Sequence, residues 1–346
     1  MGPQDRLVDA DALEEFLTDH LGPADDFAIS YHPRGYSNET FFLTWDDRDL
    51  VLRRPPAGET AEDAHDVLRE YEIYLKLQDT PVPVPGTVAA TDDKSVLGAE
   101  FYVVEQVEGR TYHDGEPEAI QSVEARRSAS EAFVDVLTSV HELDYAEVSL
   151  ESFGRPEGFT RRQIDQWTKQ LEWATAKTKE IRQVPEITEI RNWLKENRPK
   201  QTAHTLVHGD YTLQNVMFAP NTPSKVMAAF DWEMGTLGDP FTDLGWTLAS
   251  WREPSDPPNP APEFLPSYTE KEGYFTRDEF VARYEAQTGV TYDDRTFYRV
   301  FGFYKLIAVC EMFFARYLDG AENEVYPLME QYVPQMASMT IDIIGE

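Results

Sequence analysis

The sequence predicts an α+β fold with two lobes, a small antiparallel sheet lobe followed by a larger, mainly helical lobe, with a cleft between them. Two observations lead to this prediction. Short runs of alternating apolar residues, separated by turn-forming residues, gather in the first third of the 346-residue chain. Longer segments with apolar residues at helical spacing fill most of the remainder. We expect an N-terminal lobe over 1–107 and a C-terminal lobe over 108–346.

The N-terminal lobe is predicted to begin with a short helix, ADALEEFLTDHL, which Asp9 could cap. A β-β-β-α-β-β order then follows. Its single helix covers 62–79 and presents an apolar stripe formed by Ala64, Val67, Leu68, Tyr71, Tyr74 and Leu75. The strands are the alternating runs FAISYH (27–32), TFFLTW (40–45), DLVLRR (49–54), GTVAAT (86–91) and EFYVVEQV (100–107).

The C-terminal lobe is predicted to be mostly helical, with short strands on either side of the sequence HGD and another at KVMAAF (225–230). Thr276 and Glu279 form a capping box at the start of a helix near 277–287. The proline-rich segment 253–266 is expected to be an extended surface loop. Helical periodicity also marks 122–143, 159–181, 186–198, 293–318 and 323–343.

Acidic residues dominate the charged part of the composition. The 63 Asp and Glu residues face 31 Lys and Arg residues, which gives a formal net charge of −32. An acidic surface of this kind repels nucleic acid and anionic lipid, so neither is an expected partner. Repulsion also destabilises a compact fold unless salt screens it, and we therefore expect a halophilic protein. The alternative is an acidic protein that works at ordinary salt.

The chain is expected to be cytoplasmic. No apolar run approaches the length of a membrane span, and the first residues lack the basic and apolar regions of a signal peptide. The one cysteine, Cys310, lies in the apolar run KLIAVCEMFF and is expected to be a core residue rather than a reactive thiol. The sequence does not indicate an oligomeric state.

A polar loop between two apolar runs carries the clearest chemical signal, in the segment LVHGDYTLQNVMF (206–218). Asp210 and Asn215 bracket the loop, and Asp231 follows the apolar run VMAAF. An amide oxygen and a carboxylate at two strand ends form a hard-oxygen pair suited to Mg²⁺. A further Asp that is not a ligand can orient an acceptor hydroxyl and take its proton. Together with the preceding sheet lobe, these residues indicate phosphoryl transfer.

A second pair of charged residues lies in the predicted sheet lobe. Arg53 ends an apolar strand, and Glu70 shares a helix face with Ile73, Tyr74 and Leu77. A charge at the edge of an apolar stripe usually needs a partner, so we predict a buried Arg53–Glu70 ion pair. Phosphoryl transfer needs a cation at the phosphates, and Arg53 is the candidate. The alternative is that both side chains reach solvent independently.

These segments resemble the aminoglycoside phosphotransferase and choline kinase-like superfamily, the small-molecule branch of the protein-kinase fold. The resemblance covers nearly the whole chain and is strongest in HGDYTLQNVMF and AFDWEMGTLGDPFTDLGW. It implies a protein-kinase-like bilobal fold and an ATP- and Mg²⁺-dependent small-molecule kinase. By this match Asp210 is the catalytic base, and Asn215 and Asp231 bind Mg²⁺. His208 and Asp243 would be structural, with Asp243 bracing the catalytic loop.

The resemblance also implies which residues of the N-terminal lobe contact the nucleotide, with Arg53 and Glu70 as the phosphate-binding pair. In RGYSNETFF, Gly35, Ser37 and Asn38 would cover the phosphates, although a plain hairpin turn is the alternative. In EFYVVEQVEG, Glu105 and Val107 would offer backbone groups to the edge of the adenine.

One departure from the family concerns the phosphate-binding cation. The family has Lys where this chain has Arg53, which keeps the charge but replaces a point charge with a planar fork. The departure favours an alternative, a pseudokinase that binds nucleotide without turnover. The intact Asp210, Asn215 and Asp231 favour an enzyme instead. A metal-dependent hydrolase that uses His208 and Asp210 would lack a ligand cluster.

The acceptor is suggested by a second resemblance. Segment 153–174, FGRPEGFTRRQIDQWTKQLEWA, resembles a helix of the kinase-like domains associated with acyl-CoA dehydrogenases, which implies a hydroxyacyl-CoA acceptor. Arg161, Arg162 and Lys169 would then bind the phosphates of CoA, or they are solvated helix charges. The alternative acceptor is a cation, an aminoglycoside or choline. We expect the acceptor pocket in 153–180 and 295–317.

Overall fold

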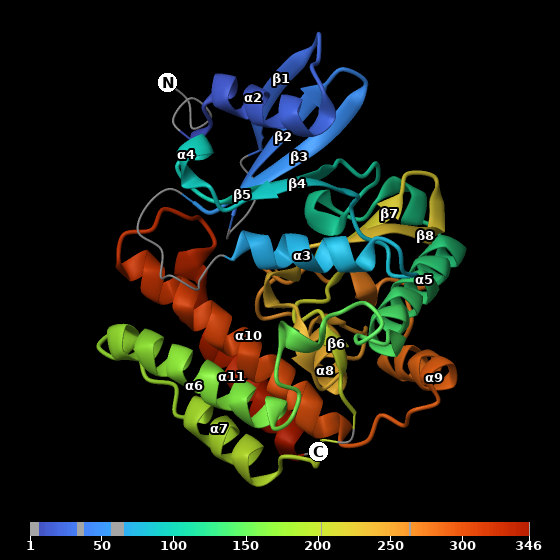
Figure 1. Cartoon of the computed structure of the whole chain (residues 1–346). Helices are drawn as coiled ribbons and strands as arrows, with labels where there is room; N and C mark the ends of the chain where they lie inside the picture. The colour runs from blue at the N-terminus through green and yellow to red at the C-terminus, as the bar shows by residue number, and fades with distance from the viewer. Residues whose placement is uncertain (1–6, 33–37, 57–65, 202, 263, 346) are drawn as a thin grey trace. The chain divides into compact units, whose positions relative to one another are not determined.

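The computed structural model describes residues 7–32, 38–56, 66–201, 203–262 and 264–345, and the chain divides into two compact units (Figure 1). The first, here called the sheet unit, comprises Met1–Arg110, Asn215–Pro220 and Val226–Gly235. The second, the helical unit, comprises Thr111–Gln214, Asn221–Lys225 and Thr236–Glu346. Each unit therefore contains part of the segment that the sequence marks as chemically important.

The sheet unit is built on a five-stranded antiparallel sheet in the order β1-β2-β3-β5-β4. All five strands appear where the sequence predicts them, and the first helix starts at the Asp9 cap as expected. The strands are β1 (Phe27–His32), β2 (Glu39–Trp45), β3 (Arg48–Arg54), β4 (Thr87–Thr91) and β5 (Phe101–Glu105), and the helices are α2 (Ala10–Leu21), α3 (Val67–Leu77) and α4 (Lys94–Leu97). The short helix α4 was not predicted. The strand β7 (Val216–Ala219) pairs with β8 (Thr222–Ala229), which starts three residues before the predicted run.

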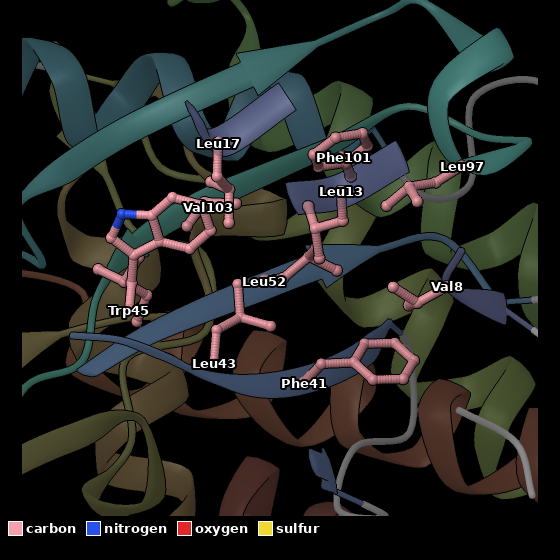
Figure 2. Packing of buried hydrophobic residues seen from close by; sticks show 11 residues of the cluster. Val8, Leu13, Leu17, Phe41, Leu43, Trp45, Leu52, Leu97, Phe101 and Val103 are labelled. Carbon is pink, nitrogen blue, oxygen red and sulfur yellow. The ribbon is translucent and has the colours of Figure 1, made fainter. Parts of the chain in front are cut away.

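Strand alternation divides the buried residues of this sheet between two faces. On one face, alternate residues of β2, β3 and β5 pack with α2 in a hydrophobic cluster (Figure 2). Leu52 belongs to this cluster, so its neighbour Arg53 points to the opposite face. Tyr102 of β5, the register partner of Arg53, meets Tyr74 of α3 there in an edge-to-face contact at 6.1 Å. The pattern of β3 thus directs Arg53 toward α3.

Helix α3 corrects two details of the prediction. It begins at Val67, where Asp66 caps it by accepting a hydrogen bond from the Arg69 N–H at 2.9 Å, and residues 57–65 lie outside the described part. Its buried face is also rotated from the predicted stripe, because Leu75 is 45% exposed and a charged residue takes the inner position. The buried residues are Val67, Glu70, Ile73, Tyr74 and Leu77. Polar partners on the neighbouring strands compensate the charge, which apolar periodicity does not take into account.

The helical unit contains seven α-helices of ten residues or more among its described residues: α5 (Val123–Glu142), α6 (Phe159–Thr178), α7 (Glu186–Glu196), α8 (Phe241–Ser250), α9 (Arg277–Thr288), α10 (Arg295–Leu318) and α11 (Met329–Gly345). Two short strands, β6 (Thr205–Val207) and β9 (Thr236–Gly238), pair antiparallel. The capping box at Thr276 is confirmed, and the described residues of 253–266 form no helix or strand. Helix α11 starts six residues later than predicted, after a 3₁₀ turn that contains Pro327.

Helix α8 was not predicted, and a close crossing with α10 explains how a short, glycine-containing segment is stabilised. A Cβ atom at Gly245 of α8 would overlap the backbone carbonyl of Tyr298 on α10. A Cβ atom at Gly302 of α10 would likewise overlap the carbonyl of Gly245. Only glycine permits the two backbones to approach so closely. The crossing places Trp246 of α8 next to Lys305 of α10, with the Lys305 Nζ 4.0 Å from the centroid of the indole.

No helix in the described ranges is both long and apolar enough to cross a membrane. Cys310 is fully buried in α10, and burial raises the pKa of its thiol far above the usual value. The sulfur therefore belongs to the core, as the sequence predicts.

We predict that salt stabilises the fold. Because 63 acids face 31 bases, repulsion acts over about 30 Å at 10 mM salt but over only about 3 Å at 1 M. The midpoint of thermal unfolding should rise as KCl is increased from 50 mM to 2 M, and labelling of the Cys310 thiol by a disulfide reagent should become slower. An unchanged or lower midpoint in KCl would contradict salt adaptation. Sucrose at matched concentration controls for stabilisation that does not depend on charge.

Candidate active site

The guanidinium of Arg53 is the centre of a charged cluster in the sheet unit. Its Nη1 lies 3.0 Å from Glu70 Oε1, which confirms the predicted ion pair. The other contacts were not predicted: Nη1 and Nη2 lie 3.2 Å from Asp231 Oδ1, and Nη2 lies 3.1 Å from Glu233 Oε1. The Arg53 side chain is 16% exposed, so these bonds form in a largely desolvated place. One cation is thus shared among three carboxylates.

Glu70 is fully buried, and four hydrogen-bond donors compensate its charge. Besides Arg53, its Oε1 accepts from the Tyr74 hydroxyl at 2.8 Å and the Trp232 backbone N–H at 3.1 Å. Its Oε2 accepts from the Tyr102 hydroxyl at 2.8 Å. A buried carboxylate with this many donors is fixed in position, because any movement leaves a polar group unpaired. Glu70 therefore holds the guanidinium in one orientation.

Asp231 adopts a left-handed backbone conformation, with φ 70° and ψ 52°. Among residues with a side chain, Asp and Asn tolerate this region best, so the strain is small but real. The Asp231 N–H donates a hydrogen bond to the Tyr74 hydroxyl at 3.2 Å, and this bond links the strained turn to α3. Left-handed residues gather at functional sites, where the surrounding structure maintains them.

Asn215, the other predicted metal ligand, lies in the same unit and is 94% buried, with a relative exposure of 6%. Its backbone carbonyl accepts a hydrogen bond from the Phe230 N–H at 3.0 Å, so the residue before Asp231 is tied directly to Asn215. An amide oxygen and a carboxylate are the ligand types that Mg²⁺ takes. The described residues contain no group of three or more His, Cys, Asp or Glu placed to bind a metal. Asn215 and Asp231 thus offer hard oxygen donors of the kind that suits Mg²⁺.

The predicted phosphate-covering loop is only partly described. Gly35 and Ser37 lie outside the described residues, while Asn38 is buried and donates from its Nδ2 to Glu233 Oε1 at 2.6 Å. The Asn38 Oδ1 and the Arg53 Nε are buried and have no hydrogen-bond partner among the described residues. Buried polar atoms without a partner are costly, so an unmatched acceptor and an unmatched donor lie in this charged cluster.

The predicted adenine contacts lie at the end of β5. The Glu105 N–H donates to the Gly86 carbonyl at 2.8 Å, and the Glu105 side chain pairs with Arg48. The Glu105 N–H is thus engaged by Gly86. Within the described ranges, the Val107 backbone makes no backbone hydrogen bond outside the regular elements. The geometry of this segment is compatible with its predicted role.

In the helical unit, Asp243 fixes the HGD loop by hydrogen bonds to its backbone. Its carboxylate accepts from the backbone N–H of His208 at 2.7 Å and of Gly209 at 2.8 Å, and from His141 Nε2 at 3.2 Å. Burial favours the neutral acid, but the hydrogen bond and charge of His141 outweigh it and keep the pKa of Asp243 below its usual value. The bracing role that the resemblance implied for Asp243 agrees with this geometry. His208 is fully buried, as expected of a structural residue.

Asp210 lies at the tip of this loop and has two neighbours that the sequence analysis missed. Its Oδ1 accepts from the Trp246 indole N–H at 2.8 Å. The Lys305 ammonium donates to the carbonyl of Gly209, the residue before it. A lysine within the apolar run FGFYKLIAVCEMFF was a visible signal for a functional charge, whereas the bond from Trp246 had none. The Asp210 carboxylate is consequently oriented by an indole and lies in the field of a buried cation.

A mostly apolar pocket opens beside the same loop. The described residues of its wall are uncharged, and the pocket borders directly on the segment after Asp210. Phe133, Thr212, Leu213, Gln214, Trp246, Thr247, Ala249, Ser250, Trp251, Leu265, Pro266, Tyr268, Thr269 and Leu306 form its wall. The wall matches the predicted acceptor segments only at Leu306; most of it comes from α8 and the loop that follows.

Two of the residues predicted to bind the CoA phosphates, Arg161 and Arg162, are either exposed or bonded to nearby groups of the chain. The Arg161 side chain is 73% exposed and lies 3.9 Å from Asp165 one turn along α6. Arg162 donates to the backbone carbonyls of Arg155 and Glu157. Arg162 thereby stabilises the loop before α6, and these contacts favour the solvated-charge interpretation.

With this geometry in place, comparison with known proteins gives the family. Residues 28–299 match the sequence profile of the phosphotransferase enzyme family. The chain belongs to this family. A mouse relative, acyl-CoA dehydrogenase family member 10, is 33% identical over 316 residues, which are 90% of this chain and 29% of that protein. The human acyl-CoA dehydrogenase family member 11 is 30% identical over 328 residues, which are 92% of this chain and 40% of that protein. The chain thus spans less than half the length of these relatives.

Solved structures of phosphotransferases have the same fold. A Ralstonia eutropha protein assigned to the aminoglycoside phosphotransferases matches with a TM-score of 0.82 and 29% identity, covering 97% of this chain and 98% of that one. The choline kinase of Cryptosporidium parvum matches with a TM-score of 0.63 and 13% identity, over 97% of each chain. An aminoglycoside phosphotransferase crystallised with ADP and hygromycin B matches with a TM-score of 0.60 and 14% identity, covering 95% of this chain and 98% of that one. The kinase-like α+β class predicted from the sequence is therefore confirmed, and the last two likenesses concern the fold alone.

Replacing Arg53 with Met is predicted to destabilise the protein more than replacing Glu70 with Gln. The first change leaves Glu70 buried without a counter-charge, at a cost of roughly 3–5 kcal/mol. The second leaves Arg53 with Asp231 and Glu233, so we expect a loss of about 1–3 kcal/mol. Urea unfolding of both single variants and the double variant, in molar KCl, measures the coupling.

Arg48→Met is the matched control for this cycle, because the Arg48 and Glu105 side chains are 37% and 40% exposed and a surface pair contributes at most about 1 kcal/mol. If the Arg53 and Glu70 losses add to within about 0.5 kcal/mol, the two residues are not coupled.

Proposed function

We propose that this chain is an ATP- and Mg²⁺-dependent phosphotransferase that transfers the γ-phosphate to a hydroxyl of a small-molecule acceptor. The observation that carries the proposal is the orientation of Asp210, with its loop braced by Asp243 and its carboxylate bonded to Trp246. Membership of the phosphotransferase family and the fold of nucleotide-bound relatives support it. A carboxylate fixed in this way suits an acceptor-orienting base better than a surface acid.

The proposed reaction assigns a role to each group. The acceptor hydroxyl bonds to the γ-phosphorus, the bond between that phosphorus and the bridging oxygen breaks, and ADP leaves. Asp210 orients the hydroxyl and takes its proton. Arg53, held by Glu70, would bind the phosphates, while Asn38 would cover them. Asn215 and Asp231 would bind Mg²⁺, which when bound neutralises charge on the phosphates.

The proposed acceptor is a hydroxyacyl-CoA. Two observations support this choice over an aminoglycoside or choline. The two relatives named above are acyl-CoA dehydrogenase family members. The described wall of the pocket beside Asp210 is mostly aromatic and aliphatic, which suits an acyl chain.

Further expectations about the working protein belong to the same proposal. We propose that it acts in the cytoplasm at high salt, and that residues 1–107 and 108–346 act as its nucleotide and acceptor lobes. A screen with radiolabelled ATP in molar KCl, over hydroxyacyl-CoAs, aminoglycosides, choline and amino alcohols, tests the reaction and its acceptor together. Nucleotide binding without transfer to any acceptor would identify a pseudokinase.

Asp210→Asn is predicted to lower kcat by roughly 10²–10⁴-fold and to leave ATP affinity unchanged. The amide keeps the shape of the side chain and can still accept from Trp246, but it cannot take a proton. Steady-state kinetics and calorimetric titration with ATP measure the two quantities. Asp342→Asn, at an exposed position of α11, is the control. Parent-level kcat in the Asp210 variant would exclude it as the base.

Asp231→Asn is predicted to abolish Mg²⁺-dependent tightening of nucleotide binding, because it removes a full negative charge from a hard-cation site. Asn tolerates the left-handed conformation and can still accept from Arg53, so folding should be preserved. Asp46, another left-handed Asp of the sheet unit with φ 53°, supplies the matched control as Asp46→Asn. Titration of each variant with ATP, with and without Mg²⁺, distinguishes a ligand from a structural residue. Unchanged metal dependence in the Asp231 variant would contradict the assignment.

A further inference from the structure

Lys305 is an unusual residue because its ammonium is buried in the helical unit beside Asp210. The residue is 4% exposed, and its Nζ lies 4.0 Å from the centroid of the Trp246 ring and 5.5 Å from that of the Trp167 ring. Burial lowers the pKa of this ammonium, while the charges of Asp210 and Asp243 oppose the shift. Helices α6, α8 and α10 thus bring two indoles and a cation to the HGD loop.

The hydrogen bonds of this cation are incomplete. An ammonium has three N–H donors, and the described part of the chain supplies one acceptor oxygen, the carbonyl of Gly209. The two indole faces attract the charge but accept no strong hydrogen bond. Neither nearby carboxylate is hydrogen-bonded to Lys305: Asp243 accepts from the loop backbone and His141, and Asp210 accepts from Trp246. Hydrogen-bonding capacity therefore remains at Nζ.

A second unsatisfied hydrogen-bond donor lies on helix α6. Trp167 of α6 is 6% exposed, and its Nε1 has no hydrogen-bond partner in the part of the chain that the structure describes. Leaving such a group unpaired costs about 1–3 kcal/mol, so a position of this kind is normally matched by an acceptor. Both unsatisfied groups, the indole N–H and the ammonium, are donors only.

We propose that Trp167 and Lys305 bind a carbonyl or carboxylate oxygen of the phosphate acceptor, next to the hydroxyl that Asp210 orients. The inference rests on the proposed phosphotransferase function and narrows its substrate class. Donors without an acceptor select an oxygen that only accepts. A quaternary or primary ammonium at this position would meet the charge of Lys305 in a desolvated place, which is strongly unfavourable.

The indole of Trp246 lies between the proposed oxygen site and the apolar pocket. Trp246 lines the pocket, bonds Asp210 through its N–H and presents its face to Lys305. The proposed acceptor therefore carries a hydroxyl for Asp210, a carbonyl or carboxylate oxygen for the two donors and an aliphatic chain for the pocket. The thioester carbonyl of a hydroxyacyl-CoA and the carboxylate of a free hydroxy acid share the required chemistry.

The test combines a change in the protein with a change in the substrate. Trp167→Phe keeps an aromatic ring and removes the N–H, and Trp173→Phe makes the same change at a 44% exposed site on the same helix. The probes are a hydroxyacyl-CoA thioester and its thioether analogue, which lacks only the carbonyl, assayed in molar KCl. We expect the parent protein and Trp173→Phe to prefer the thioester by about tenfold in kcat/KM, the value of one buried hydrogen bond. Trp167→Phe should lose this preference and keep its KM for ATP.

Lys305 is tested by charge and by acceptor class. Lys305→Met should lower kcat/KM for the thioester and for a free hydroxy acid by tenfold or more. It should also reduce the preference for these acceptors over an amino alcohol of equal length. Lys305→Arg should restore part of the loss, since it keeps the charge. A greater effect on the free acid than on the thioester identifies a carboxylate as the preferred source of the oxygen. The reverse identifies the thioester carbonyl.

Two results would overturn the proposal while leaving the phosphotransferase function intact. One is equal kcat/KM for thioester and thioether in the parent protein, which would leave the donors to water. The other is a rise in KM for ATP, rather than for the acceptor, in the Trp167 and Lys305 variants, which would assign the donors to a phosphate. If no acceptor is phosphorylated at all, calorimetric titration with the two CoA compounds still decides the oxygen site. A thioester preference that Trp167→Phe abolishes would support the site and refute the reaction.

Discussion

The sheet unit depends on the neutralisation of one buried carboxylate. Glu70 is fully desolvated on α3, and it is tolerable there only because donors from β3, β5, α3 itself and the turn at Trp232 converge on it. The most distant of these donors in the chain, the Trp232 N–H, is 162 residues from Glu70. Satisfying Glu70 therefore fixes the distance between the sheet, its helix and the Asp231 turn. The same bonds that stabilise the fold also determine where Arg53 presents its charge.

The helical unit solves an equivalent problem with Asp243. Its two oxygens accept the consecutive N–H groups of His208 and Gly209, which determines the conformation of the loop that leads to Asp210. Asp243 thus fixes the backbone that leads to Asp210, while Trp246 orients the Asp210 carboxylate. In each unit a buried acid thus fixes the backbone that carries a less buried acid: Glu70 does so for Asp231, and Asp243 does so for Asp210. This division separates the charges that stabilise from the charges that are available to a ligand.

Sequence reasoning located what periodicity and spacing encode. Arg53 ends an apolar strand run, and Glu70 shares a helix face with Ile73 and Tyr74, so the pair could be predicted as two charges at apolar edges that need a partner. The stripe chosen for the rest of α3 was wrong at Leu75, because the pattern weighed apolar residues only and the true inner face includes an acid. Trp246 bonds Asp210 from 36 residues away in the chain, and periodicity does not encode a contact between a helix and a loop at that separation. Lys305 was detectable as a charge within an apolar helix, but its neighbours were not.

The contact between Gly245 and Gly302 has a consequence for how this enzyme family can diversify. Where two helices are separated by side chains, a larger residue on one can be offset by a smaller one on the other, and the spacing can change gradually over many generations. Here the two backbones already touch, so no smaller residue exists on either side and compensation is not available. The interval between α8 and α10 is therefore effectively frozen. The residues around this crossing, including the pocket wall contributed by the loop after α8, are not held by this constraint and can vary.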